Sequence, residues 1–265
     1  MKDILEEIVA CKRIEIAVQK EQTPPRKLYA EVEEMMDRGV EKRSLSQALT
    51  DDAVGIIAEF KRKSPSKGWI KEDGKAEEIP LSYERAGAAA LSILTDEAYF
   101  GGSLGFIRTA RPLVKLPILR KDFIIDEYQI FQARHAGADA VLLIAADLTR
   151  QEVRSLTATA HELALEVLLE LHSERELDYA EIDVDAVGVN NRNLGSFVTD
   201  VQNSFRMAGR LPQDKVLVSE SGIAKAGTIA LLREAGYRGF LIGESFMKTD
   251  NPGETLRQFI EETAS

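Results

Sequence analysis

The stretch Ile56-Ile57-Ala58-Glu59-Phe60-Lys61-Arg62-Lys63-Ser64-Pro65-Ser66-Lys67-Gly68 begins as a strand and ends as a loop. Its first half is short, apolar and opens with a β-branched pair, which favours a strand. Alternate residues of an extended chain share a face, so Glu59, Lys61 and Lys63 should point the same way. Proline and glycine then predict a loop. This charge pattern fits a site at the end of a strand, although a solvated edge strand would also explain it.

The composition narrows the class of protein. A chain of 265 residues is long for one ordinary domain and has the usual length of a (β/α)8 barrel. The net charge of −10 argues against non-specific binding to nucleic acid or to an anionic membrane. A local basic cluster can still bind a small anion. The single cysteine, Cys11, excludes a disulfide framework and a thiol-rich metal site, and we expect it to pack as a small hydrophobe on a helix.

The sequence shows no targeting or membrane segment. No apolar run approaches the roughly 20 residues of a membrane span. The acidic N-terminus also lacks the apolar core of a signal peptide. We therefore expect a cytoplasmic protein.

The first 50 residues differ from the rest of the chain. Apolar residues recur at helical spacing and predict a helix over residues 3–20; they are Ile4, Leu5, Ile8, Cys11 and Val18. Weaker helices are predicted over Lys27–Met36 and Ser44–Leu49. We expect residues 1–50 to form a helical extension that covers one end of a barrel formed by residues 51–265, the two together making one structural domain.

From residue 55 onward one unit recurs, a short apolar strand followed by a helical pattern. The predicted strands are Gly55–Lys61, Ala89–Thr95, Pro117–Phe123, Ala140–Ala146, Glu166–His172, Ala186–Arg192, Lys215–Ser221 and Gly239–Ser245. Helices are predicted between some of them, over Tyr83–Ala90, Gln129–Gly137, Thr149–Glu162 and Lys225–Gly236. Crossover helices make the strands parallel, and eight such units predict a closed (β/α)8 TIM barrel. The alternative, an open doubly wound sheet, would usually carry a glycine-rich dinucleotide fingerprint, which the sequence lacks.

Catalytic groups of such barrels lie at the C-terminal ends of the strands. The predicted ends bring charged and polar residues to one mouth, among them Glu59, Lys61, Lys121, Glu170, His172, Asn190, Arg192, Glu220, Ser221 and Glu244. Unpaired buried charges are costly, so the lysines and glutamates should pair. Pairing and desolvation shift pKa values in ways that suit proton transfer. A salt-bridge network that only stabilises the mouth is the alternative for any single residue, but it explains the whole set poorly.

Two further groups predict parts of a binding site. Ser221-Gly222-Ile223 and Gly243-Glu244-Ser245 place glycines where backbone N–H groups can approach a phosphate, in the loops after strands seven and eight. Lys63 would add a positive charge there, although ordinary turns also explain the glycines. Phe100, in a predicted loop, could form an apolar wall for an aromatic ligand with Phe123 and Leu142. Core packing is the alternative, and it is the better one for Leu142.

The three histidines have no metal-ligand spacing, and we find no partner for His172. Trp69 has no specific interpretation.

Together these motifs resemble the indole-3-glycerol-phosphate synthases of tryptophan biosynthesis over nearly the whole chain. The segments that carry the resemblance are Ile4–Ala10 with Lys12-Arg13, Glu59–Ser66, Leu119–Ile124, Glu170, Asn190–Leu194, Ser219–Ile223 and Leu241–Ser245. Asn193 stands where the family usually has Asp, and Ser173 where Asn is common. Neither departure touches a residue assigned to chemistry.

The resemblance implies a reaction and a division of roles. The substrate is 1-(2-carboxyphenylamino)-1-deoxyribulose 5-phosphate, which closes to indole-3-glycerol phosphate with loss of carbon dioxide and water, without metal or cofactor. Lys121 is implied as general acid and Glu170 as general base. Lys61 is implied as the holder of the anthranilate carboxylate and as an acid in the dehydration, and Glu59 as the residue that orients the lysines or relays a proton. The implied sugar contacts are Asn190, Arg192, Glu220 and Ser221. The implied phosphate contacts are Lys63, Ser64, Gly222, Gly243, Glu244 and Ser245.

Two other functions compete with this one. A sugar-phosphate isomerase of the same pathway would need one acid and one base, not two lysines with two glutamates. A catalytically silent binding barrel would lack a full acid and base set. We expect a monomer that acts on a phosphorylated small molecule and at most associates weakly with other tryptophan-pathway enzymes.

Overall fold

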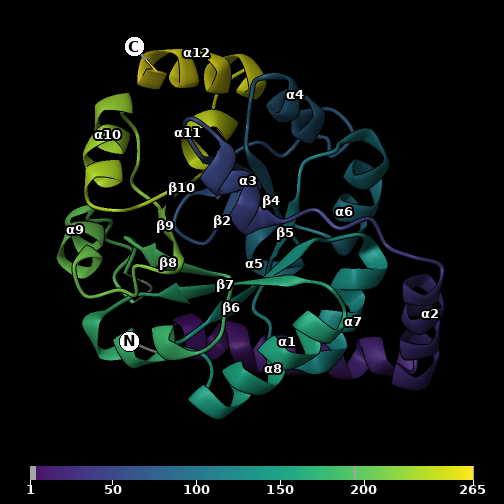
Figure 1. The fold of residues 1–265 in the computed structure, drawn as a ribbon. Coiled ribbons are helices and arrows are strands. Elements are labelled where there is room, and N and C mark those ends of the chain that lie inside the picture. The colour runs from purple at the N-terminus through teal and green to yellow at the C-terminus, as the bar shows by residue number, and fades with distance from the viewer. Residues whose placement is uncertain (1–3, 194, 265) are drawn as a thin grey trace.

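The computed structural model describes residues 4–193 and 195–264, and within them eight parallel strands close into a barrel (Figure 1). The predicted TIM barrel is confirmed. Around the barrel the strands follow the order β1-β10-β9-β8-β7-β6-β5-β4. Their bounds are β1 Ile56–Phe60, β4 Ala90–Leu94, β5 Ile118–Lys121, β6 Ala140–Ile144, β7 Glu166–Leu171, β8 Ala186–Asn190, β9 Val216–Glu220 and β10 Gly239–Ile242. Residue 3 of the predicted first helix and Leu194 of the quoted motif lie outside the described residues.

Helices cover the outside of the barrel, because parallel strands must be buried on both faces. They are α4 Ile79–Arg85, α5 Glu97–Phe100, α6 Leu104–Ala110, η1 Arg111–Leu113, α7 Glu127–Ala136, α8 Arg150–Glu162, η2 Glu174–Glu181, α9 Gln202–Ala208, α10 Ala226–Glu234, α11 Glu244–Met247 and α12 Pro252–Ala264. The space between strands and helices holds one apolar cluster, and the barrel interior holds a second that includes Ile57, Leu119, Leu168 and Val218.

Two predicted segments differ from the structure. The bounds of the helix predicted over Tyr83–Ala90 are wrong, because α4 spans Ile79–Arg85. Gly87 has a φ of +95°, and the N–H of Ala88 donates to Tyr83 O, which is a left-handed helix end. The loop predicted around Phe100 is instead the one-turn helix α5, whose N-terminus is capped by the Asp96 side chain.

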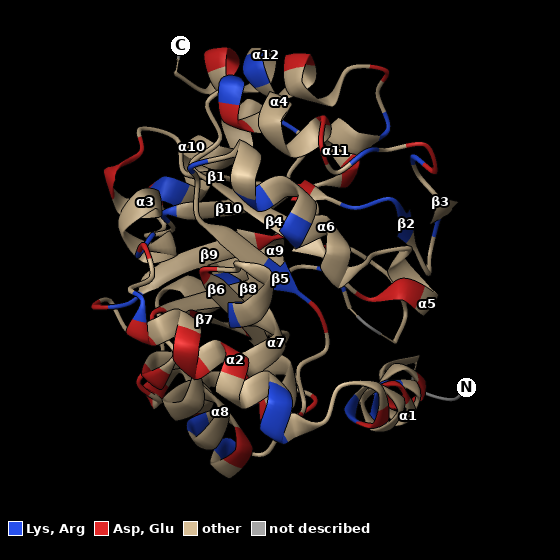
Figure 2. Cartoon of the chain, turned by 90° about the vertical axis from the view of Figure 1, so that its right-hand side faces the viewer, with Lys and Arg blue, Asp and Glu red and all other residues tan. Residues whose placement is uncertain are grey.

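The N-terminal extension reaches both ends of the barrel, where the sequence predicted one. Its helices are α1 Ile4–Gln22, α2 Pro25–Asp37 and α3 Leu45–Asp51. Figure 2 shows α1 on the side of α5 and of the small hairpin formed by β2 Lys63–Ser64 and β3 Gly68–Trp69, with α3 on the opposite side. The side chain of Leu49 on α3 packs against the start of β10. Helix α2 packs along α7, where Tyr29 stacks on Phe131.

The buried face of α1 differs from the predicted one. Leu5 and Ile8 are buried as helical spacing predicts, but Val18 is 45% exposed, and Ile16, which was not predicted, is buried. Lys12 takes a place on the buried face and is 1% exposed. Cys11 is half-buried. No described helix is long and apolar enough to cross a bilayer.

Candidate active site

A cavity lies at the C-terminal ends of the strands. It brings together twelve of the predicted site residues: Glu59, Lys61, Ser64, Phe100, Lys121, Phe123, Leu142, Glu170, Asn190, Arg192, Glu220 and Ser221. The sequence analysis did not predict that the first helix also lines the cavity. Ile4, Leu5 and Ile8 of α1 close the cavity from above the strand ends. Their positions on an amphipathic helix revealed that they were buried, but not what they covered.

The innermost group is a lysine between two glutamates. Lys121 Nζ at the end of β5 donates to Glu170 Oε2 at 3.2 Å and lies 3.8 Å from Glu220 Oε2. The glutamates stand near the ends of β7 and β9, and their side chains are 2% and 1% exposed. Gly188 makes this possible, because a Cβ at that position would lie 2.3 Å from Glu220 Oε1. The glycine on β8 thus leaves room for a carboxyl group inside the barrel.

Burial and mutual charge set the protonation of these three groups. Burial alone would lower the pKa of Lys121, but Glu170, Glu220 and Glu59 outweigh it and hold that pKa above its ordinary value. Burial also opposes the Glu170 carboxylate, yet Lys121 and His172 bring the pKa of Glu170 well below its usual range. Burial and the negative charge of Glu170 both raise the pKa of Glu220 well above its ordinary value. The cluster therefore offers a protonated amine, a carboxylate and a carboxyl group that readily holds a proton.

A second pair stands beside the first. Lys61 Nζ lies 2.7 Å from Glu59 Oε1, and both residues come from the end of β1. Gly243, just after β10, leaves space for Glu59, because a Cβ there would lie 2.5 Å from Glu59 Oε1. The structure thus brings both lysines and all three glutamates of the predicted site into one cavity.

His172 has a partner that the sequence analysis did not find. Its Nε2 lies 3.1 Å from Glu170 Oε1, on the side of the carboxylate away from Lys121 Nζ, which binds Oε2. Burial would lower the pKa of His172, but Glu170 and Glu176 raise it above the ordinary value. Lys121 partly opposes this rise. Glu170 therefore has Lys121 at one oxygen and His172 at the other.

Four of the six predicted phosphate residues line an adjoining hollow. Gly222, Gly243, Glu244 and Ser245 border it, and Lys61, Ser66, Arg192 and Ser221 border both this hollow and the cavity. Ser221 and Gly222 have φ values of +69° and +77°. Successive backbone groups in such a turn form a concave surface that suits an anion.

Lys63 does not lie with the other predicted phosphate residues. Its Nζ donates to Ala98 O at 3.0 Å and lies 5.7 Å from the centre of the Trp69 ring. Strand β1 ends at Phe60, and Lys63 belongs to the next strand, so the alternation from Glu59 and Lys61 does not extend to it. Lys63 lines neither of the two hollows described above.

The apolar and polar walls of the cavity are separate. Phe100 and Phe123 approach with ring centres 6.0 Å apart and form one wall with Leu142 and α1. On the other side, Arg192 Nη1 donates to Ser66 Oγ at 2.7 Å, and its backbone N–H donates to Asn190 Oδ1. A ligand with an aromatic half and a polar, anionic half fits this division. Among the described residues, no group of three or more His, Cys, Asp or Glu is arranged to hold a metal ion.

Comparison with known proteins places these residues in one family. The family model described as "Indole-3-glycerol phosphate synthase" matches residues 5–259. The protein of that name from Bacteroides thetaiotaomicron is 60% identical over 261 residues, which cover 98% of this chain and 99% of the relative. The one from Aromatoleum aromaticum is 42% identical and covers 97% of this chain and 98% of the relative.

Solved structures show a likeness of fold alone. A tryptophan synthase a2b2 complex from Pyrococcus furiosus matches with a TM-score of 0.60 and 13% identity, over 80% of this chain and 98% of the other. The tryptophan synthase alpha subunit from Legionella pneumophila matches with a TM-score of 0.61 and 13% identity, over 84% of this chain and 99% of the other.

Proposed function

The chain belongs to the indole-3-glycerol phosphate synthase family and has that family's carboxy-lyase activity, and from this premise we propose which residues perform each part of the reaction. The enzyme converts 1-(2-carboxyphenylamino)-1-deoxyribulose 5-phosphate to indole-3-glycerol phosphate, a step of tryptophan biosynthesis. An aromatic carbon must attack a ketone carbon of the same molecule, carbon dioxide must leave, and then water must leave.

Lys121 is the general acid that protonates the ketone oxygen as the ring closes. One observation carries this assignment: its Nζ faces the cavity while Glu170 and Glu220 hold it protonated. A positioned acid of this kind contributes about 10²–10⁴-fold to the rate. Glu170 is the general base that accepts a proton as water leaves, and its 3.2 Å contact with Lys121 Nζ places acid and base side by side.

Lys61 holds the carboxylate that later leaves as carbon dioxide, and it supplies the proton in the dehydration. Glu59, 2.7 Å from Lys61 Nζ, orients it. Phe100, Phe123 and Leu142 form the wall against the aromatic ring.

The sugar chain and the phosphate occupy the polar side. Asn190, Arg192, Glu220 and Ser221 contact the sugar, and the adjoining hollow with Gly222, Gly243, Glu244 and Ser245 takes the phosphate. Ser64 and Lys63 complete the phosphate set only if the hairpin that carries them moves toward the hollow. Fixing both ends of a flexible substrate supplies much of the entropic gain of ring closure.

We also propose that the enzyme works as a monomer in the cytoplasm and associates at most weakly with other enzymes of its pathway. The soluble, acidic surface, with a net charge of −10, supports this.

The test is to incubate the purified chain with the anthranilate-derived ribulose phosphate and to record the indole fluorescence of the product. We expect rapid formation of indole-3-glycerol phosphate in the wild type and very little in Lys121→Ala. A sugar-phosphate isomerase would give no indole from this substrate, and neither would a silent binding barrel.

A further inference from the structure

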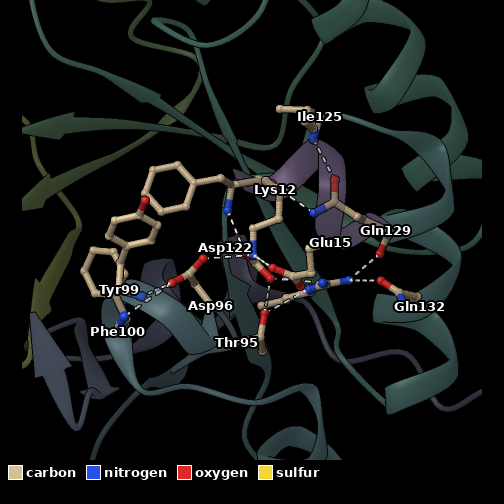
Figure 3. Close-up of polar contacts among 12 residues, drawn as sticks. Lys12, Glu15, Thr95, Asp96, Tyr99, Phe100, Asp122, Ile125, Gln129 and Gln132 are labelled. Carbon is tan, nitrogen blue, oxygen red and sulfur yellow. Dashed lines mark hydrogen bonds and ion pairs between the residues drawn. The ribbon is translucent and has the colours of Figure 1, made fainter. Parts of the chain in front are cut away.

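Lys12 is a buried lysine that the reaction does not use. It lies on α1, and its side chain is 1% exposed. Figure 3 shows its amine between carboxylates from three places in the chain. Lys12 Nζ lies 2.8 Å from Glu15 Oε2, 2.9 Å from Asp96 Oδ2 and 3.0 Å from Asp122 Oδ1. We refer to Lys12, Glu15, Asp96 and Asp122 as the Lys12 cluster.

Asp96 connects the Lys12 cluster to the aromatic wall. Its second oxygen, Oδ1, accepts hydrogen bonds from the backbone N–H of Tyr99 at 2.8 Å and of Phe100 at 3.3 Å. These bonds cap α5, the helix that carries Phe100 into the cavity. The orientation of Asp96 therefore fixes the orientation of Phe100, and Lys12 fixes Asp96.

Asp122 connects the same amine to the end of β5. It stands between Lys121 and Phe123, which both line the cavity. Asp122 Oδ1 also accepts from the Phe123 N–H at 2.8 Å, and Oδ2 accepts from Arg120 Nη2 at 3.0 Å. A carboxylate with this many partners locks the backbone on both sides of it.

Lys12 itself belongs to the helix that closes the cavity. Ile8 and Leu5 lie one and two turns before Lys12 on the same face of α1, and both line the cavity. Three separate segments of the apolar wall, α1, α5 and the end of β5, thus meet at one ammonium group.

The surroundings of Lys12 keep its amine in the charged form. Burial would lower the pKa of Lys12, but Asp122 and Asp96 outweigh it and hold the pKa above its ordinary value. Hydrophobic contact alone would let a helix slide along an apolar surface. A buried ion with several fixed partners selects one register, because any other leaves charges unpaired.

We propose that Lys12 is a positioning residue that holds α1, α5 and the end of β5 in the one arrangement that forms the apolar half of the substrate cavity. This inference rests on the proposed function, and it predicts that Lys12 sets the affinity for the aromatic half of the substrate rather than the rate of the chemical steps.

The variant Lys12→Met removes the charge and keeps most of the side-chain length. We expect KM to rise about tenfold and kcat to stay within about threefold, the pattern for an interaction that binds substrate and transition state alike. Lys20→Met is the matched control. Lys20 lies on the same helix and pairs with Asp126 at 2.7 Å, but it is one-third exposed and does not line the cavity. We expect this control to keep the wild-type KM.

A second readout needs no substrate. Trp69 is the only tryptophan of the chain, and its ring packs against Gly101, which ends α5. A Cβ at Gly101 would lie 2.7 Å from this ring, so the emission of Trp69 reports the placement of α5. We expect a changed emission spectrum in Lys12→Met and an unchanged one in Lys20→Met.

A folded Lys12→Met protein, as judged by circular dichroism, with wild-type KM and wild-type Trp69 emission would overturn the proposal. So would a fall in kcat at unchanged KM. If Lys12→Met does not fold, Asp96→Asn replaces it, because asparagine still caps α5 while the ion pair with Lys12 is lost. A smaller rise in KM is expected there, and an unchanged KM would overturn the proposal. A wild-type chain that forms no indole would refute the proposed function instead, and the emission of Trp69 would still test the role of Lys12.

Discussion

Two buried lysines lie beside the end of β5, and they differ in how their charge is satisfied. Lys121 borders the cavity with a side chain 15% exposed, and its carboxylate partners lie 3.2 and 3.8 Å away. Lys12 is 1% exposed, and three carboxylates lie within 3.0 Å of its amine. Glu220 lies farther from the amine of Lys121 than any of the three carboxylates lies from the amine of Lys12. Loose pairing leaves Lys121 free to meet a substrate, whereas tight pairing makes Lys12 an anchor.

The difference begins at two adjacent residues at the end of β5. Lys121, the last residue of β5, contacts Glu170 and Glu220, while the next residue, Asp122, contacts Lys12. Two adjacent residues of the chain thus belong to two charge clusters. The cluster around Lys121 takes part in the reaction, whereas the Lys12 cluster holds the structure in place. The predictions below test whether these two tasks are separable.

The largest effect should come from Lys121→Met. Loss of the general acid should lower kcat by about 10²–10⁴-fold, because methionine cannot protonate the ketone oxygen as the ring closes. Steady-state indole formation measures this. Lys12→Met is the comparison, and its kcat should stay near wild type. Equal losses of kcat in the two variants would show that the clusters are not separate.

The free energy of unfolding should fall more in Lys12→Met than in Lys121→Met, the reverse of the order expected for kcat. Lys12→Met leaves Asp96 buried without the lysine and leaves Asp122 with Arg120 alone, and breaking a buried ion pair costs about 3–5 kcal/mol. Lys121→Met should cost less than half of that, since Glu170 and Glu220 border the cavity and can share one proton. Urea unfolding gives both free energies. A larger loss in Lys121→Met would reverse the assignment of anchor and acid.

The sequence predicted the reactive cluster far better than the structural one, and the reason is physical. Glu59, Lys121 and Glu170 stand at strand ends, and the barrel topology alone brings such ends together. Lys12 pairs with partners 84 and 110 residues later in the chain. Helical periodicity assigns a charged residue to the solvent side, so it could not find this lysine.

Two other misses have local causes. His172 lies two residues after Glu170, and alternation within a strand places both on one face, so the signal for this pair was present in the sequence. The predicted orientation of the Lys63 side chain differs from the structure for the opposite reason. Alternation was extended beyond Phe60, where β1 ends and a separate hairpin begins. Strand ends, which decide how far a periodic pattern holds, are the least certain part of any sequence-based prediction.

A third and smaller effect concerns the pH dependence of the reactive cluster. The pKa of His172 is raised above its ordinary value of 6.5, mainly by Glu170 against the opposing effect of burial. Its contact with Glu170 therefore stabilises the folded state fully below pH 6.5, and this contribution is lost as the pH rises through the folded-state pKa. His172→Gln should cost about 1.5–3 kcal/mol at pH 6, the range for hydrogen bonds to charged groups, and less at pH 9.

Urea unfolding of wild type and His172→Gln across this pH range measures the effect. The charged groups that act on His172 are Glu170, Glu176 and Lys121. Glu176→Gln is therefore the control, and it should reduce the pH dependence without removing it. The pKa of Lys12 is held above its ordinary value and that of Asp122 below it, so Lys12→Met should be destabilised by similar amounts at pH 6 and pH 9. A free-energy difference for His172→Gln that grows with pH would contradict the assigned charge of the pair.

The smallest effect should come from Lys63→Ala. This variant tests whether a third lysine, Lys63, acts as Lys121 does or as Lys12 does. Lys63 donates to Ala98 O on α5 and has no buried carboxylate partner in the described chain, so its loss should change stability by less than about 0.5 kcal/mol. If the hairpin moves and Lys63 binds the phosphate, KM should rise about threefold at unchanged kcat, and inhibition by inorganic phosphate should weaken by a similar factor. If Lys63 only tethers α5, phosphate inhibition stays as in the wild type while Trp69 emission shifts. The two outcomes decide whether this lysine acts on the ligand, as Lys121 does, or on the wall, as Lys12 does.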